Sequence, residues 1–581
     1  MHIILLIGLL FISIVSSDIL VDLPDGTIRG TETNVGNSTM YAYLGIPFAA
    51  PPLGKLRFQA PVQNDPWDGI LDATKSRSCC LPMGLVFQSS TQNEDCLYLN
   101  IYTPPRNVKK LPVMFWIYGG GFVMGCATDS EFNPIHLVNE DVIVVTSNYR
   151  LGLFGFLSTN DSVILGNAGL KDQLLALKWT QQNIALFGGD PDKVTIFGES
   201  AGGVSVGAHI ANKKSAGLYR AAICQSGCSL ASFPDSYQSD PKQVAYDIAK
   251  SLNSSISQDS EEIRDFLQSQ SVTVLALAFF ANPQTGLVTE VEDENAYNTE
   301  LHFGSIESGN FNQVPVIIGT NSAETIILAF STLEIEMLAF AFDVLSTLVL
   351  PSNLKYLPGT NLVDVSNLIK QAYTNQSFAL DLASFIEFTS DTLFVRSSLK
   401  QAELQSNYST VYFYQFSYSG SGSSFHIKVE GTGTVGHAEE LFYIFEAPIY
   451  PLTTDEELLT RRRMVRLWTN FAKTLNPTSD KSDPLLNVTW PQVSGSNIPY
   501  LDIGATLEVK PGKKEKQMAM WNEVFYAYGE QPFAGPVIEV EDDDAYITDR
   551  QFGLIESGNF NQIPLLIGTT SGESLTFYGS V

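Results

Sequence analysis

One short stretch constrains the fold more than any other part of this 581-residue chain. The apolar, β-branched run 194–197 leads into a Gly-Glu-Ser-Ala-Gly sequence, and small residues with helical character follow it. This pattern predicts a strand, a sharp turn and a helix, with Ser200 at the tip of the turn. Such a turn requires small residues two before and two after the serine, which are Gly198 and Gly202 here. An exposed serine hydroxyl at this place is a candidate nucleophile.

A serine nucleophile needs a base, an acid that orients the base, and hydrogen-bond donors for an oxyanion. Three consecutive glycines at 119–121 follow an apolar run, so their N–H groups can approach a ligand without side chains in the way. Glu324 follows the apolar run 314–318, where a strand is predicted to end in a loop. His437 lies in a glycine-rich loop just before an apolar helical segment. Ser200, Glu324 and His437 therefore occur in the nucleophile–acid–base order of an α/β-sheet hydrolase.

Each of these features also has an ordinary structural interpretation. A glycine triplet can be a plain turn, and a glutamate near a helix N-terminus is common for electrostatic reasons. The other histidines lack the context of His437: His2 lies in the N-terminal apolar segment and His209 on the helix after Ser200. Structural roles are the default for the remaining three, His136, His302 and His426. The combination of elbow, glycines, acid and histidine favours catalysis over these separate explanations.

Continuous apolar runs predict the strands of the fold. The predicted strands occupy 94–102, 111–118, 141–146 and 194–197, and runs of this kind suit strands covered by helices on both faces. Residues 170–187 have helical periodicity and end at two glycines, and 19–29 has the pattern of a hairpin. Further helices are predicted at 396–404 and 461–475. We expect a doubly wound α/β architecture, with a large, mostly parallel central sheet and helices on both faces.

The segment 324–350 is helical in pattern and very apolar. We expect it to form a buried or closely packed pair of helices. The alternative interpretation is that part of it forms the wall of a lipophilic substrate gorge.

The N-terminal segment 1–17 is predicted to be a signal peptide. An apolar run from Ile3 to Val15 is too short to span a bilayer, and small residues before Asp18 suit cleavage. Asn-x-Ser/Thr sequences fit a secreted, glycosylated chain and occur at Asn37, Asn160, Asn253, Asn375, Asn407 and Asn487. No anchor or transmembrane run is evident toward the C-terminus, so we expect an extracellular protein.

The net charge of −28 argues against nucleic acid or an anionic membrane as a partner. Six cysteines occur, at positions 79, 80, 96, 126, 224 and 228. A bridge from Cys79 or Cys80 to Cys96 would close a short loop in an oxidising compartment, and the other pairings stay open. Their spacing with the histidines matches no zinc pattern, so no metal is implied.

Part of the chain is repeated near its end. Sequence from the region 282–330 recurs in 531–581 at a constant offset of 249 residues, so that Glu573 corresponds to Glu324. No second elbow accompanies the copy. We expect residues 18–530 to form one domain and 531–581 to be a dispensable tail that does not fold as an independent domain.

Several longer motifs resemble those of the type-B carboxylesterases, the cholinesterase-like α/β-hydrolases, and of the insect esterases in particular. They cover the chain from about residue 18 to Tyr526, and together they are specific. The matching segments are 94–100, 118–122, 148–150 with 155–156, 166–173, 187–191, 198–203, 225–227, 436–437 and 467–473.

This resemblance implies a role for each residue that matches the family pattern. Ser200 would be the nucleophile, His437 the base and Glu324 the acid of a serine carboxylesterase. The backbone N–H groups of Gly120, Gly121 and Ala201 would hold the oxyanion, and no cofactor would be required. The resemblance further implies a Cys80–Cys96 disulfide, with Cys79 as the rival partner, and two ion pairs, Arg57–Glu94 and Arg150–Asp172.

Departures from the family narrow the expected activity to esters other than choline esters. The loop between Cys80 and Cys96 has no tryptophan for cation–π contact with a choline group. Glu199 stands where juvenile hormone esterases usually carry glutamine, which lowers that interpretation without removing it. The segment 253–266 lacks the second cysteine pair that is common in the family. The substrate is expected to be a small lipophilic ester, and the alternatives are a catalytically silent adhesion protein or a juvenile hormone or pheromone esterase.

Overall fold

The computed structural model describes residues 19–81, 92–105, 109–127, 133–231, 238, 240–281, 286–328, 331–351, 361–420, 427–447, 450–480, 482–512 and 514–528. The predicted signal peptide, His2, His426 and the duplicated tail lie outside the described residues.

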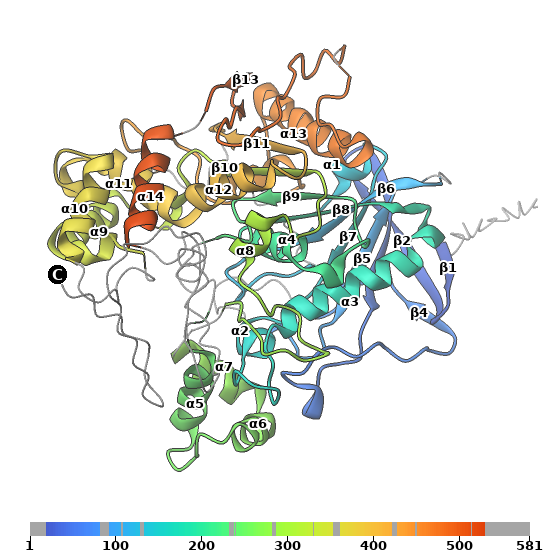
Figure 1. Ribbon diagram of the computed structural model, residues 1–581. Helices are drawn as coiled ribbons and strands as arrows, with labels where there is room; N and C mark the ends of the chain where they lie inside the picture. Colours follow the sequence, from blue (N-terminus) through green and yellow to red (C-terminus); the bar gives the residue numbers. More distant parts are fainter. Residues whose placement is uncertain are drawn as a thin grey trace, which may run out of the picture.

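A large mixed sheet forms the centre of the molecule (Figure 1). Its strands follow one another across the sheet in the order β1-β2-β3-β5-β7-β6-β8-β9-β10-β11-β12-β13, and β4 pairs with β2. The strand bounds are β1 Ile19–Leu23, β2 Gly26–Val35, β3 Ser38–Pro47, β4 Ile70–Asp72, β5 Tyr98–Thr103, β6 Leu111–Ile117, β7 Ile143–Ser147, β8 Gly189–Glu199, β9 Ala221–Gln225, β10 Val316–Asn321, β11 Val411–Phe416, β12 Tyr500–Ile503 and β13 Leu507–Lys510.

The middle of the sheet is parallel and its two ends are antiparallel. Neighbouring strands are parallel from β7 through β6, β8, β9, β10 and β11 to β12. The strands β1, β2, β3, β5 and β7 pair antiparallel at one end, and β12 with β13 at the other. Every residue of β7, β9 and β10 is buried, which explains why these strands are apolar on both faces. The predicted α/β-hydrolase architecture is confirmed.

Helices cover both faces of this sheet. The helices α3 Ala168–Asn183 and α4 Ala201–Ala211 pack against its parallel middle, as do α12 Arg396–Gln405 and α13 Asp455–Thr474 (Figure 1). Shorter helices follow individual strands and loops: α1 Ile135–Val138, α2 Gly152–Phe156 and α8 His302–Ser308. The predicted helices at 170–187, 396–404 and 461–475 are therefore present, with slightly different bounds.

Two smaller helical groups flank the sheet. The helices α5 Pro241–Leu252, α6 Ser260–Ser269 and α7 Val272–Ala281 share one apolar cluster. A second cluster is formed by α9 Thr332–Val344, α10 Leu362–Tyr373, α11 Leu382–Ser390 and the last helix, α14 Glu515–Tyr528. Figure 1 shows this second group lying together beyond β10 and β11. Its helices come from distant parts of the sequence, since more than 150 residues separate α9 from α14.

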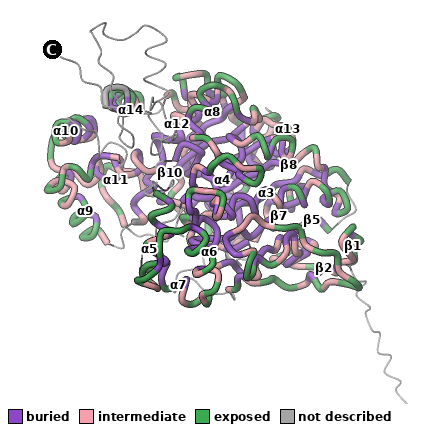
Figure 2. The backbone as a smooth tube through the Cα atoms, turned by 60° about the horizontal axis from the view of Figure 1, so that its bottom comes forward, coloured by how far each residue is buried: buried purple, intermediate pink, exposed green. Residues whose placement is uncertain are grey.

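The prediction that 324–350 forms a buried or closely packed pair of helices is wrong, because its described residues form one α-helix, α9, and two 3₁₀ turns, Glu324–Leu328 and Ser346–Val349. Helix α9 buries Ile335 and Ala339, but Leu333, Met337, Phe340 and Val344 have exposed fractions of 62–64%. These four residues follow the i, i+4, i+7 and i+11 spacing of one helix face. Figure 2 shows α9 at the margin of the molecule, with exposed residues along it. Sequence alone could not distinguish the two outcomes, because α9 is apolar on its inner and outer faces alike.

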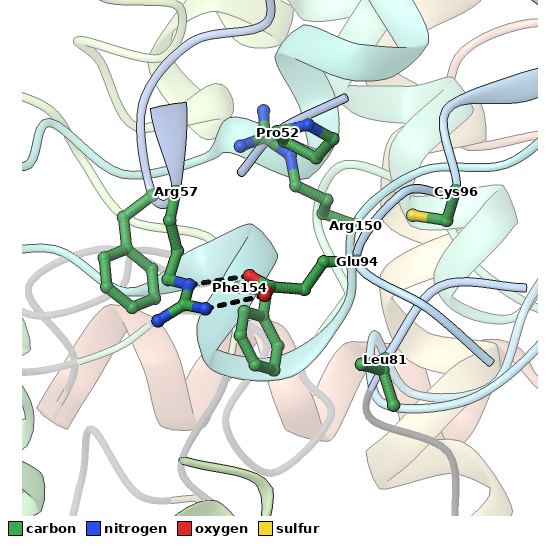
Figure 3. A pocket seen from close by; sticks show the side chains of 8 residues that line it. Pro52, Arg57, Leu81, Glu94, Cys96, Arg150 and Phe154 are labelled. Carbon is green, nitrogen blue, oxygen red and sulfur yellow. Dashed lines mark hydrogen bonds and ion pairs between the residues drawn. The ribbon is translucent and has the colours of Figure 1, made fainter. Parts of the chain in front are cut away.

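Two disulfides and two buried ion pairs hold the loops beside the sheet. Cys80 bonds to Cys96 as expected, and Cys79 bonds to Cys126, which leaves Cys224 and Cys228 as buried free thiols. Arg57 and Glu94 form a two-pronged contact with both N–O distances at 2.6 Å (Figure 3).

Arg150 pairs with Asp172 through contacts of 2.6 and 2.8 Å. Both ion pairs implied by the resemblance are confirmed. The small pocket in Figure 3 is lined by residues of these pairs and is a structural feature of the loops.

Candidate active site

The turn between β8 and α4 has the strained geometry of a nucleophile elbow. Ser200 has φ 56° and ψ −126°, a conformation that a side-chain-bearing residue adopts only where its surroundings impose it. Its N–H donates to the Gln225 carbonyl over 2.8 Å, which ties the turn to β9. A Cβ atom on Gly202 would lie 2.0 Å from the Ile117 carbonyl oxygen, and one on Gly198 would lie 2.5 Å from the Gly202 oxygen. Both positions therefore require glycine, as the sequence predicted.

The glycine triplet lies directly against this elbow. A Cβ on Gly119 would come within 2.6 Å of the Glu199 carbonyl oxygen and 3.0 Å of the Ser200 Cβ. Gly120 and Gly121 have φ of 109° and 60°, values that other residues rarely adopt. Among the described residues, the N–H groups of Gly120, Gly121 and Ala201 donate no hydrogen bond. Unused donors beside a serine are what an oxyanion-binding loop requires.

Glu324 and His437 meet although 113 residues separate them. His437 Nδ1 lies 2.8 Å from Glu324 Oε2, and the His437 N–H donates to the Glu324 carbonyl over 3.1 Å. The other carboxylate oxygen accepts hydrogen bonds from Ser226 Oγ at 2.7 Å and from the Asn321 N–H at 2.6 Å. Glu324 has no exposed surface, so its position is set by three donors and not by solvent.

The opposite nitrogen of the imidazole points toward the elbow. His437 Nε2 lies 3.1 Å from Glu199 Oε1, and Glu199 is the residue before Ser200. The contact has an ion-pair distance without hydrogen-bond alignment. Within the described residues, Ser200 Oγ makes no hydrogen bond to the imidazole. The structure thus brings Glu324, His437 and the elbow together, and the final alignment of Ser200 with His437 is not present in it.

Carboxylates dominate the electrostatics of this imidazole. Burial acts to lower the pKa of His437, but the Glu199 and Glu324 carboxylates outweigh it and raise the pKa to about 9. Burial raises the pKa of Glu199 to about 8, against the opposing effect of His437. A proton on Glu199 removes its attraction for a proton on His437, so the two groups titrate as a pair. The pair can hold a neutral imidazole, the form that accepts a proton.

The other described histidines have structural roles. His209 Nδ1 contacts Tyr297 Oη at 2.6 Å and Nε2 contacts Gln173 Oε1 at 2.9 Å, and burial lowers its pKa to about 3. His302 contacts Asn298 at 2.7 Å and His136 contacts Glu446 at 2.7 Å. None of these three reaches the elbow, in agreement with the sequence interpretation.

Three further groups near His437 have no catalytic role assigned from sequence. Glu199 lies 3.1 Å from His437 Nε2, and Ser226 donates a hydrogen bond to Glu324. Glu440 is buried and accepts hydrogen bonds from Asn321 Nδ2 at 2.6 Å and Gln225 Nε2 at 3.1 Å. Burial and the nearby Glu324 carboxylate raise the pKa of Glu440. The available signal was local, because Glu199 adjoins Ser200 and Glu440 lies three residues after His437.

Among the described residues, no group of three or more His, Cys, Asp or Glu side chains is arranged so that it could hold a metal ion. No described helix is both long and apolar enough to cross a bilayer.

This chain is similar to known ester hydrolases over most of its length. A sequence profile of the carboxylesterase family matches residues 17–521. Pyrethroid hydrolase Ces2a of Mus musculus is 33% identical over 522 residues, which cover 85% of this chain and 89% of that protein. Juvenile hormone esterase of Tribolium castaneum is 33% identical and covers 80% of this chain and 84% of its own.

A solved structure shows the same fold. Juvenile hormone esterase of Manduca sexta, crystallised with OTFP covalently attached, superimposes with a TM-score of 0.78 at 28% identity. The match covers 88% of this chain and 100% of that structure. With a family match across most of its length, the chain belongs to the carboxylesterase family and is a carboxylic ester hydrolase of the α/β-hydrolase fold.

Proposed function

We propose that Ser200, His437 and Glu324 form the catalytic triad of this ester hydrolase. The observation that carries the proposal is the 2.8 Å contact between His437 Nδ1 and buried Glu324, beside a serine held at φ 56°. Glu324 selects the tautomer in which Nε2 is free to accept a proton, and it stabilises the imidazolium once the proton arrives. The strained elbow keeps Ser200 in front of the glycine loop.

The proposed reaction has two steps through an acyl-enzyme. Ser200 Oγ attacks the ester carbonyl while His437 takes its proton, and the N–H groups of Gly120, Gly121 and Ala201 stabilise the oxyanion. The alcohol leaves with the proton from His437. Water, deprotonated by His437, then attacks the acyl-enzyme and releases the carboxylic acid. No cofactor takes part in either step.

We further propose that the substrate is a small lipophilic ester and that the protein acts outside the cell. Relatives of similar identity are named for pyrethroid, juvenile hormone and cocaine hydrolysis, so no single substrate is favoured by likeness. Five of the six glycosylation candidates are exposed, and Asn253 is half-buried. Exposure makes these sites accessible to a glycosyltransferase, which is consistent with secretion.

A fluorophosphonate probe tests the proposed nucleophile. The probe should label the protein at Ser200, and Ser200→Ala should abolish labelling and lower kcat by about 10⁶-fold. A panel of p-nitrophenyl esters of increasing acyl length would then define the substrate. The alternative of a silent adhesion protein predicts no labelling in the wild-type protein. Labelling that persists in S200A would show that the nucleophile lies elsewhere.

A further inference from the structure

One helical segment contacts the base of the proposed triad and the residue that follows its acid. It runs from α11 through a π-helical turn, η9 Asp391–Val395, into α12. A π turn inside a helix is rare and is found most often at functional sites. Helix α11 contacts the 3₁₀ turn η5 Glu324–Leu328, which carries the proposed acid, and η9 contacts β10.

The inner side of this segment faces the triad. The Phe394 ring lies on the His437 imidazole, with 4.4 Å between the ring centroids and 38° between their planes. Thr325, the residue after Glu324, receives its support from the same segment. Its N–H donates to Ser390 Oγ at 3.2 Å, and its Oγ1 contacts Thr389 Oγ1 at 2.6 Å.

The outer side is held by the C-terminal part of the chain. Asp391 has an exposed fraction of 2% and accepts a hydrogen bond from Tyr373 Oη at 3.1 Å. Lys514 donates to the other oxygen of Asp391 and also lies 3.1 Å from Glu387 on α11. Trp521 Nε1 donates to Tyr373 Oη at 2.8 Å, which extends this network to α14.

A second contact attaches the same turn to α14. Arg396 is 1% exposed, and its guanidinium lies 4.7 Å from the ring centroids of both Trp521 and Phe525. Asp391 attracts this guanidinium electrostatically. The buried charges of Asp391, Arg396 and Lys514 compensate one another, so removing one partner leaves the others in an unfavourable environment.

The π turn explains how one helical segment contacts His437 on one side and Lys514 on the other. Residues three apart lie on the same face of a regular α-helix. Here Asp391 and Phe394 are three apart, yet one meets Lys514 and the other meets His437. The wider π turn directs the side chains of Asp391 and Phe394 to different sides of the helical segment. A displacement of Asp391 therefore also displaces Phe394.

We propose that Asp391 and Lys514 are positioning residues of the active site, which hold the π turn so that Phe394 keeps the His437 imidazole in place and shielded from water. This inference rests on the proposed triad. It predicts that the C-terminal helix, which contacts no reacting atom, sets the efficiency of acyl transfer. Water beside a displaced Phe394 weakens the attraction of the Glu199 and Glu324 carboxylates for the imidazolium, so the pKa of His437 falls from about 9 and the acid limb of activity moves to lower pH.

The test is a double-mutant cycle on p-nitrophenyl butyrate hydrolysis, with kcat, KM and the pH profile measured for Lys514→Gln, Phe394→Leu and the double variant. We expect K514Q to lower kcat by about 10- to 100-fold, because small displacements at a catalytic centre have effects of this size, and to move the acid limb to lower pH. In the F394L background most of the K514Q effect should disappear. Lys514→Arg keeps the charge and should restore near wild-type kinetics.

Lys510→Gln is the matched control, because Lys510 pairs with Asp502 at the sheet edge and touches nothing near the π turn. It should leave kcat and the acid limb unchanged.

If K514Q does not fold, Tyr373→Phe removes the milder contact to Asp391. This variant should show the same shift of the acid limb with a smaller loss of kcat. Equal losses from K514Q with and without Phe394, or an unchanged acid limb, would overturn the proposal. Full activity in S200A would instead refute the triad on which it rests.

Discussion

At the residue scale, the site consists of one imidazole among three buried glutamates that differ in their hydrogen-bond partners. Glu324 accepts hydrogen bonds from Ser226 and Asn321 and contacts His437, and these three partners hold its carboxylate in place. Glu199 is buried and its Oε1 accepts no hydrogen bond from the described residues. Burial raises the pKa of Glu199 to about 8. The same side-chain type therefore serves as the orienting acid in one place and as a titrating neighbour in another.

The charge of Glu199 should govern the acid limb of activity. Glu199→Gln removes a negative charge 3.1 Å from His437 Nε2, so the pKa of His437 should fall from about 9. Because the neutral imidazole is the active base, the acid limb of kcat/KM should move to lower pH. A pH–rate profile from pH 5 to 9 measures this shift. Movement to higher pH would contradict the electrostatic assignment, and Glu261→Gln on the exposed surface of α6 serves as the control.

At the element scale, the elbow depends on the close approach of α4 to β6. Gly202 lies where any Cβ would overlap the Ile117 carbonyl, so the strand, the turn and the helix can meet only with glycine at this place. This is a backbone constraint, and backbone atoms cannot move aside as the end of a flexible side chain can.

Gly202→Ala should therefore destabilise the protein by about 3 kcal/mol or more through overpacking, and it should lower esterase activity. The midpoint of thermal unfolding is the measurement. Gly304→Ala is a matched control, because a Cβ at this exposed position of α8 meets nothing within 4 Å. It should stabilise the helix by up to about 1 kcal/mol. Equal unfolding midpoints for the two variants would contradict the steric argument.

The exposed face of α9 gives a second prediction at this scale. Leu333→Gln, Met337→Gln and Phe340→Gln should each change the free energy of unfolding by no more than about 0.5 kcal/mol, as surface substitutions do. Ile335→Ala on the inner face should destabilise by about 2–5 kcal/mol, because Ile335 is 3% exposed. Chemical denaturation measures both. A large loss from the glutamine variants would mean that the outer face is covered in solution.

At the scale of the whole molecule, α14 is the last element of the described fold. Trp521, Val524 and Phe525 are buried in the cluster shared with α9, α10 and α11, and the family profile ends at residue 521. The repeated tail follows these elements and carries neither a second elbow nor a second glycine triplet.

A chain truncated after Gly529 should therefore keep its esterase activity and its unfolding midpoint. Truncation before Lys514 should abolish activity, because it removes α14 and the buried aromatic residues that it contributes. Activity toward p-nitrophenyl butyrate and thermal unfolding test both variants. Loss of activity in the longer of the two would mean that the tail contributes to the fold.

The amino-acid sequence alone was sufficient for the features that depend on local pattern. The elbow at Ser200, the apolar strands β5 to β8 and the order of Ser200, Glu324 and His437 all follow from short motifs and periodicity. The Cys80–Cys96 bridge and the two ion pairs came from resemblance, and they are present.

The tertiary structure decided everything that depends on which distant segments meet. Cys79 pairs with Cys126 over 47 residues, α9 turns an apolar face outward, and Lys514 reaches Asp391 across 123 residues. Sequence patterns report the preference of a segment for burial or for a conformation, and they carry no information on its partner. The chain thus specified the proposed nucleophile and its elbow locally, whereas packing determined what surrounds His437 and holds it in place.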